Sequence, residues 1–126
     1  MQNIESILEE KKLFIGKTAG DSMEPMLCEG RDTVIIVPPS FPLRSGDVPV
    51  YRRDGHYTMH RIIRATPKRL YVCGDNRKDL ETDIRESDIV GVLAAFYRDQ
   101  TYVSCDDPAY RQYTEKMCRR FPAIFC

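Results

Sequence analysis

Residues 47–75 read DVPVYRRDGHYTMHRIIRATPKRLYVCGD, and this stretch decides the fold class. The short runs DVPVYRR, YTMHRIIRA and RLYVCGD are rich in β-branched and aromatic residues, and the turn sequences DGH and TPK separate them. Runs of this kind between turn signals are typical of strands. Their close spacing predicts a barrel-like body of short strands. Pro49 lies inside the first run and favours an edge strand, because proline cannot donate a ladder hydrogen bond.

The remaining sequence extends this β pattern. Further β-branched runs are KLFIGKTAG (12–20), RDTVIIVP (31–38) and DIVGVLAAFYR (88–98), while SFPLRSG (40–46) and NRKDLETDIRES (76–87) are expected to be loops. The sequence therefore predicts a mainly β, coiled barrel-like fold with a short helix at each end. One domain is expected over residues 1–126, with a lead-in at 1–16, a core at 17–98 and a helical extension at 99–126.

Both predicted helices have capping signals. Asn3 can cap a helix that extends to Lys12, in which apolar residues recur at helical spacing. Near the other end, an aspartate at position 106 or 107 can cap a second helix, and Pro108 suits its first turn. The apolar residues at helical spacing there are Tyr110, Tyr113, Met117, Phe121 and Ile124. This second helix is expected to kink or stop near Pro122.

Composition and charge exclude several classes of protein. The 126 residues include 19 lysines and arginines and 19 aspartates and glutamates, so no excess charge attracts nucleic acid or an anionic membrane. The longest apolar runs, TVIIV and IVGVLAAF, are far shorter than the ~20 residues of a membrane-spanning helix. The acidic N-terminus MQNIESILEEKK is unlike a signal peptide. We expect a soluble, cytoplasmic protein.

The cysteines give no sign of a disulfide framework or a metal site. They are Cys28, Cys73, Cys105, Cys118 and Cys126, an odd number without a C-x-x-C pair. We expect reduced structural thiols, with Cys126 exposed at the terminus, and no metal or other cofactor.

The stretch GDSMEPML, Gly20–Leu27, contains a residue that could do chemistry. Ser22 lies in a turn flanked by glycine and proline, where serine is either a turn former or a nucleophile. A nucleophilic serine needs a base. His56 falls in the turn RDGHY and is expected to be exposed, whereas His60 is expected in mid-strand among apolar neighbours. Taken singly, these residues are better explained as a turn serine and a half-buried strand histidine.

The order of these pieces along the chain changes this interpretation. A Ser-Met-x-Pro segment is followed by SGDVPVYR, then His-Arg-Ile, then GDNR and finally IVGVL. Over residues 17–98 this arrangement resembles the clan of signal peptidases and LexA-like serine peptidases. SMEP at Ser22–Pro25 and HRI at His60–Ile62 most resemble the endoplasmic-reticulum type of signal peptidase, in which histidine replaces the lysine base. Unlike those enzymes, this chain is expected to have no membrane anchor.

The resemblance implies roles for individual residues. Ser22 would attack the scissile carbonyl and form an acyl-enzyme, and His60 would act as the general base. The backbone N–H of Ser22 would stabilise the oxyanion, because Gly20 stands where many relatives have a side chain that helps. Asp21 adds a negative charge beside the expected oxyanion. The residues expected around the oxyanion and the cleft are Gly20, Asp21, Met23 and Pro25.

The segment GDNRKDLETDIR contains several acids that could orient the base. In the histidine-type relatives an acid after Gly-Asp-Asn has this role, and the candidates are Asp75, Asp79, Glu81 and Asp83. We favour Asp83, because DIR resembles the Asp-Ser-Arg segment that follows GDNR in the bacterial enzymes. Gly74, Asp75 and Asn76 are expected to be structural, with Asp75 bonding backbone N–H groups in a turn.

The leading functional hypothesis is a soluble serine endopeptidase that cleaves a peptide or protein precursor through a Ser22/His60 dyad. The alternative is a catalytically weak or inactive peptide-binding module of the same fold. A third possibility is peripheral membrane contact through the C-terminal helix, where basic residues accompany apolar ones: Arg111, Lys116, Arg119 and Arg120 with Tyr113, Met117, Phe121 and Phe125. Packing of the apolar stripe on the barrel is the more ordinary explanation. No nucleic-acid partner is expected.

Overall fold

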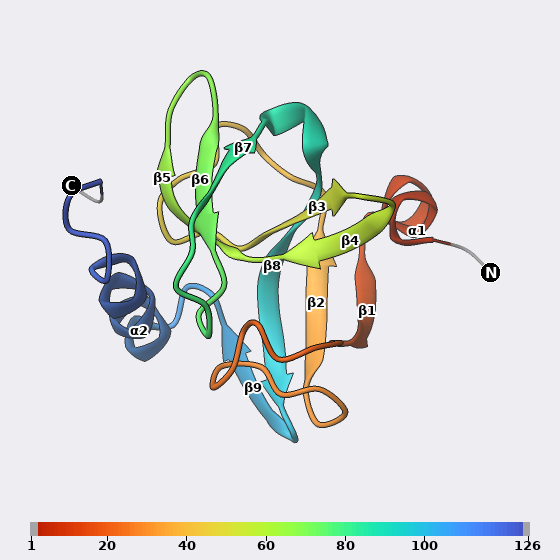
Figure 1. Cartoon of the computed structure of the whole chain (residues 1–126). Helices are drawn as coiled ribbons and strands as arrows, with labels where there is room; N and C mark the ends of the chain where they lie inside the picture. Colours follow the sequence, from red (N-terminus) through yellow and green to blue (C-terminus); the bar gives the residue numbers. More distant parts are fainter. Residues whose placement is uncertain (1–2, 125–126) are drawn as a thin grey trace.

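The computed structural model describes residues 3–124 and shows a mainly β protein with a helix near each end (Figure 1). This architecture confirms the predicted fold class. The elements in chain order are α1 (Ile4–Lys11), β1 (Phe14–Lys17), β2 (Thr33–Val37), β3 (Pro49–Arg53), β4 (His56–Met59), β5 (Arg61–Ala65), β6 (Leu70–Cys73), β7 (Glu81–Ile84), a 3₁₀ turn (Glu86–Asp88), β8 (Ile89–Arg98), β9 (Thr101–Ser104) and α2 (Pro108–Cys118). Within residues 3–124, neither helix has the length and apolarity needed to span a membrane.

The strands in the described part of the chain form two antiparallel sheets. The larger has six strands in the order β1-β2-β8-β3-β4, with β9 also paired to β8, and the smaller contains β5, β6 and β7. The long strand β8 connects the larger sheet, because it pairs with β2, β3 and β9. The register shifts where β8 pairs with β2 and with β3 leave Ala94 and Val90 as extra residues of β8, and such bulges bend a sheet. Its edge strands β1 and β4 consequently line one shared pocket.

Residues 57–65, predicted as a single strand, divide into β4 and β5, which belong to different sheets. His60 lies between the two strands and is therefore not a mid-strand residue. Ile62 pairs with β6 and also bonds the segment just before β3, so the chain passes from the larger sheet to the smaller one at this point. Its N–H donates to the Asp47 carbonyl at 2.8 Å, and its carbonyl accepts from the Gly46 N–H at 2.7 Å.

The predictions for two further strands are also corrected. β3 lies between β8 and β4, so the prediction of an edge strand from Pro49 is wrong. Pro49 is the first residue of β3, a position where the sheet tolerates its missing N–H. β7 lies within a segment predicted to be a loop. Glu81–Ile84 carries only one buried residue, Ile84, and becomes a strand through its pairing with β6.

Both helices begin where the capping signals predict. The side chains of Asn3 and Asp107 accept hydrogen bonds from backbone N–H groups in the first turns of α1 and α2. α2 ends at Cys118, before the predicted stop near Pro122, and the chain then tightens into hydrogen bonds between residues three apart. Tyr110 and Cys118 are buried, so one face of α2 packs on the body of the protein.

The cysteines within the described residues are free thiols: Cys28, Cys73, Cys105 and Cys118. Burial raises the pKa of the Cys105 thiol to about 11, which keeps it protonated at neutral pH. Cys126, predicted to be exposed, lies outside residues 3–124, as does Phe125 of the predicted basic and apolar pattern.

The Asp32 carboxylate connects the loop before β2 to the turn between β8 and β9. It is fully buried and accepts hydrogen bonds from the Cys28 N–H at 2.7 Å, the Asp99 N–H at 2.9 Å and the Arg31 side chain at 2.7 Å. Burial alone would raise the pKa of Asp32, but the hydrogen bonds outweigh it and lower the pKa from 3.8 to about 2.

This shift predicts an acid-dependent loss of stability. A carboxyl whose pKa is lowered by folding stabilises the protein above its unfolded pKa and loses that contribution as the pH falls through its folded pKa. Asp32 is therefore expected to account for about 2 kcal/mol of unfolding free energy that disappears between pH 4 and pH 2. Urea unfolding across this range should show a flatter profile for Asp32→Asn than for wild type. The exposed Asp54→Asn should follow wild type, and an unchanged profile in Asp32→Asn would contradict the assignment.

Candidate active site

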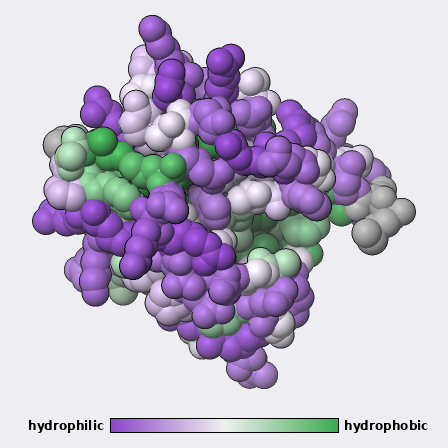
Figure 2. Space-filling view, viewed as in Figure 1, coloured by the Kyte–Doolittle hydropathy of each residue, from purple (hydrophilic) through white to green (hydrophobic). Residues whose placement is uncertain are grey.

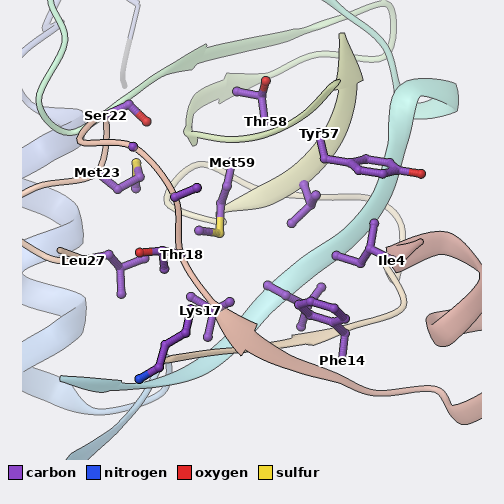
Figure 3. A pocket seen from close by; sticks show the side chains of 15 residues that line it. Ile4, Phe14, Lys17, Thr18, Ser22, Met23, Leu27, Tyr57, Thr58 and Met59 are labelled. Atoms are coloured by element: carbon purple, nitrogen blue, oxygen red, sulfur yellow. The ribbon is translucent and has the colours of Figure 1, made fainter. Parts of the chain in front are cut away.

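The turn that carries Ser22 connects β1 to β2 and is anchored in the core. Met23, Met26 and Leu27 are each at most 4 % exposed and belong to the main hydrophobic cluster. The Leu27 N–H donates to the Met23 carbonyl at 3.0 Å, which closes the turn. Burial of three neighbouring apolar side chains leaves Ser22 half-buried at the surface of the turn, so that its hydroxyl lies at one end of the pocket (Figure 3).

A second loop, residues 74–77, lies directly against this turn. The Asn76 N–H donates to the Ser22 carbonyl at 2.8 Å, and the Asn76 side chain donates to the Asp21 carbonyl at 3.1 Å. A Cβ on Gly74 would lie 2.6 Å from the Ser22 carbonyl oxygen, closer than any side chain tolerates. The glycine is thus required by the close approach of the two backbones. Gly74 and Asn76 thus contact the backbone of the Ser22 turn directly.

The His60 ring approaches Gly74 on the same side as the Ser22 backbone. A Cβ on Gly74 would be 3.2 Å from His60 Cδ2, so the Ser22 backbone and the His60 ring approach the same glycine. The Nδ1 atom of His60 is 2.9 Å from Glu81 Oε1 and 2.9 Å from the Tyr51 hydroxyl. Neither His60 Nε2 nor Ser22 Oγ makes a hydrogen bond within residues 3–124, so Nε2 is the ring nitrogen open to a new partner.

Glu81, and not Asp83, is the acid that contacts the histidine. Its Oε1 accepts from the Tyr51 hydroxyl at 2.5 Å, and its Oε2 lies 3.0 Å from Arg53 Nε. Asp83 is exposed and pairs with the Arg53 guanidinium at 3.0 Å and 3.1 Å, so the assignment of Asp83 as the orienting acid is not supported by the geometry. Strand register explains the difference. Glu81 lies opposite Val72, level with the start of β5, whereas Asp83 is further along β7 and away from His60.

Tyr51 is a site residue that the sequence analysis missed. It is fully buried, and burial together with the neighbouring Glu81 raises the pKa of its hydroxyl, which stays protonated and donates to the carboxylate. Tyr51 and Glu81 therefore hold the Nδ1 edge of His60 from two strands. In the sequence, Tyr51 looks like an ordinary core aromatic residue of a strand. Its neighbour Arg52 is polar, and because successive side chains of a strand point to opposite faces, this indicates only that Tyr51 faces inward.

The charge of Asp21 is paired with Arg77. Its carboxylate bonds the Arg77 guanidinium at 2.6 Å, and this ion pair lowers the pKa of Asp21. Among the residues expected around the cleft, Gly20 and Met23 line the pocket. Asp21 and Pro25 do not, because Asp21 turns toward Arg77 and Pro25 is exposed on the outer side of the turn.

The Asp75 carboxylate has partners that differ from those predicted. Instead of bonding backbone N–H groups of its turn, its carboxylate accepts two 2.8 Å hydrogen bonds from Arg61 and one from the Tyr113 hydroxyl. Arg61 is fully buried and also donates to Tyr110 and Thr114 of α2. Arg61 and Asp75 are thus paired in the interior, and both are bonded to α2. These bonds fix the segments that contain His60 and Gly74 to one helix.

The pocket beside Ser22 opens between the sheet edges β1 and β4 and has a volume of about 370 Å³. It appears in Figure 2 as an apolar hollow within a mostly polar surface. Its apolar lining includes Met23, Leu27, Val34, Ile36, Val50 and Met59. Among the lining side chains Lys17 is the only charged one, at the end opposite Ser22 (Figure 3). The arrangement suits an extended peptide with apolar side chains.

Most of the chain matches one protein family. Residues 2–94 match the family model described as Peptidase S24-like. The chain belongs to the Peptidase S24-like family. This membership confirms the predicted clan and indicates a peptidase-type hydrolase with a peptide or protein substrate. A search of curated proteins found no match to the sequence. The match includes Ser22, His60 and Glu81, whereas α2 lies beyond it.

Proposed function

We propose that this Peptidase S24-like protein is a serine endopeptidase in which Ser22 is the nucleophile, His60 the general base and Glu81 the acid that orients it. The observation that carries the proposal is the approach of the Ser22 backbone and the His60 ring to the same point beside Gly74. The hydrogen bond from His60 Nδ1 to Glu81 favours the tautomer with the proton on Nδ1. That tautomer leaves Nε2 as a proton acceptor.

The chemistry follows from these assignments. His60 Nε2 takes the proton of Ser22 Oγ as Oγ bonds to the scissile carbonyl carbon, and the Glu81 carboxylate stabilises the resulting imidazolium. The Ser22 N–H, which has no acceptor within residues 3–124, donates to the oxyanion. The imidazolium then protonates the leaving amine, and the C–N bond breaks to give an acyl-enzyme. Water, deprotonated by His60, hydrolyses the ester and releases the acid and free Ser22.

The pocket supports a substrate that binds in extended form. The exposed edges of β1 and β4 offer unpaired backbone groups on both sides of the hollow, and the apolar lining accepts alternate side chains of a strand. We propose a peptide or protein precursor with apolar residues near the cut. Membrane contact through α2 is less favoured, because its face with Tyr110, Thr114 and Cys118 is buried against the body.

A fluorophosphonate probe tests this function directly. It reacts only with a serine whose hydroxyl is activated by a base, so wild type should be labelled at Ser22 and the Ser22→Ala variant should not be labelled. Ser45→Ala removes an exposed serine outside the site and should leave labelling unchanged. Peptide hydrolysis should disappear with the labelling, while Ser22→Ala should still bind the peptide. If wild type binds peptides but is neither labelled nor active, the protein is a peptide-binding module.

A further inference from the structure

Arg120 binds the loop that supports Ser22. It follows α2 in the chain and is half-buried. Its guanidinium donates to the carbonyls of Gly74 at 3.2 Å, Asp75 at 3.1 Å and Arg77 at 2.8 Å. A further hydrogen bond, to the Met117 carbonyl at 2.9 Å, attaches the same side chain to α2. One side chain therefore connects the last turn of the helix to three carbonyls of the loop.

The loop of residues 74–77, which Arg120 binds, contacts the turn that carries Ser22. Between the carbonyls of Asp75 and Arg77 lies Asn76, whose N–H donates to the Ser22 carbonyl. The Gly74 carbonyl is also held, and Gly74 approaches both Ser22 and His60. A shift of this loop would change the position of both groups. Arg120 itself does not line the pocket, so any effect on turnover must act through the loop.

Buried hydrogen bonds attach α2 to the body of the protein. Tyr110 and Thr114 of α2 bond the buried Arg61, and Tyr113 bonds Asp75. A planar guanidinium offers five donors in a fixed arrangement, which suits several carbonyls at once, whereas an ammonium is a single point of charge. Lysine at this position could satisfy part of the set only.

We propose that Arg120 is a positioning residue for Ser22 and His60, which fastens the loop of residues 74–77 to α2, outside the part of the chain shared with the family. This inference rests on the proposed function. Because correct placement within about 1 Å matters for turnover, the Arg120→Ala variant should lose roughly ten- to a hundredfold in kcat. Its KM should change by less than about threefold, because the pocket lies elsewhere.

The test compares wild type with Arg120→Ala, Arg120→Lys and Arg119→Ala at a temperature where circular dichroism shows all four folded. Arg119 is the neighbouring arginine and is exposed; within residues 3–124 its side chain pairs only with Glu115, so its variant should keep wild-type kcat. Arg120→Lys should lie between wild type and Arg120→Ala. Hydrogen exchange of the Asn76 amide gives a readout independent of activity, and protection should fall in Arg120→Ala but not in Arg119→Ala.

Several results would overturn the proposal: unchanged kcat in folded Arg120→Ala, an equal loss in Arg119→Ala, a loss that appears mainly in KM, or unchanged protection of Asn76. Failure of the proposed function looks different, because wild type would then be inactive and unlabelled by fluorophosphonate. In that case the exchange of Asn76 alone decides whether Arg120 holds the loop.

Discussion

In the His60→Ala variant, peptide hydrolysis is expected to fall by roughly 10³-fold or more, because the proposed base that takes the proton from Ser22 is removed. His60 is the imidazole beside the Ser22 turn, with its Nδ1 edge held by Tyr51 and Glu81. Steady-state rates on a fluorogenic peptide measure the loss.

The matched control is His56→Ala. His56 is exposed at the start of β4, so its variant should retain nearly full activity. The acid that orients the base is tested alongside. Glu81→Gln should reduce kcat by roughly ten- to a hundredfold, because it removes the charge that stabilises the imidazolium. Asp83→Asn, which loses only an exposed ion pair with Arg53, should remain within about threefold of wild type.

Two outcomes would contradict these assignments. Wild-type rates in His60→Ala would show that another group is the base. A larger loss in Asp83→Asn than in Glu81→Gln would return the orienting role to Asp83.

The largest effect on stability is expected from the buried pair Arg61 and Asp75. Burial alone would lower the pKa of Arg61, but its bonds with Asp75 outweigh this and raise it, so the guanidinium stays charged. Replacing Arg61 by methionine leaves Asp75 buried without its counter-charge. We expect a loss of roughly 3–5 kcal/mol in the free energy of unfolding, measured by urea titration.

A double-mutant cycle distinguishes this pair from ordinary packing. Arg61→Met combined with Asp75→Asn should cost clearly less than the sum of the two single variants, because neither charge remains unpaired. Arg119→Met breaks the exposed pair with Glu115 and should change stability by less than about 1 kcal/mol. Additive losses in the cycle would mean that the two side chains do not stabilise the fold as a pair.

Much of the fold could be predicted from local patterns. Asn3 and Asp107 cap their helices because a side-chain oxygen can reach N–H groups only a few residues away. Runs such as TVIIV form strands because β-branched side chains pack well on a pleated surface. β7 was not predictable in this way, since Glu81–Ile84 has no apolar pattern and depends on its partner strand β6.

For the site, the motifs and their order along the chain were enough to select Ser22 and His60 as candidates and to indicate the family. Each motif is a short stretch that can be recognised without knowing how the chain folds. Which acid faces His60 depends on the register between β6 and β7, and this selects Glu81 over Asp83. The contributions of Tyr51 and Arg120 depend on distant contacts that leave no local signal in the sequence. Local chemistry thus determined the strands, the caps and the choice of candidate residues, whereas long-range pairing and burial decided which side chains those candidates face.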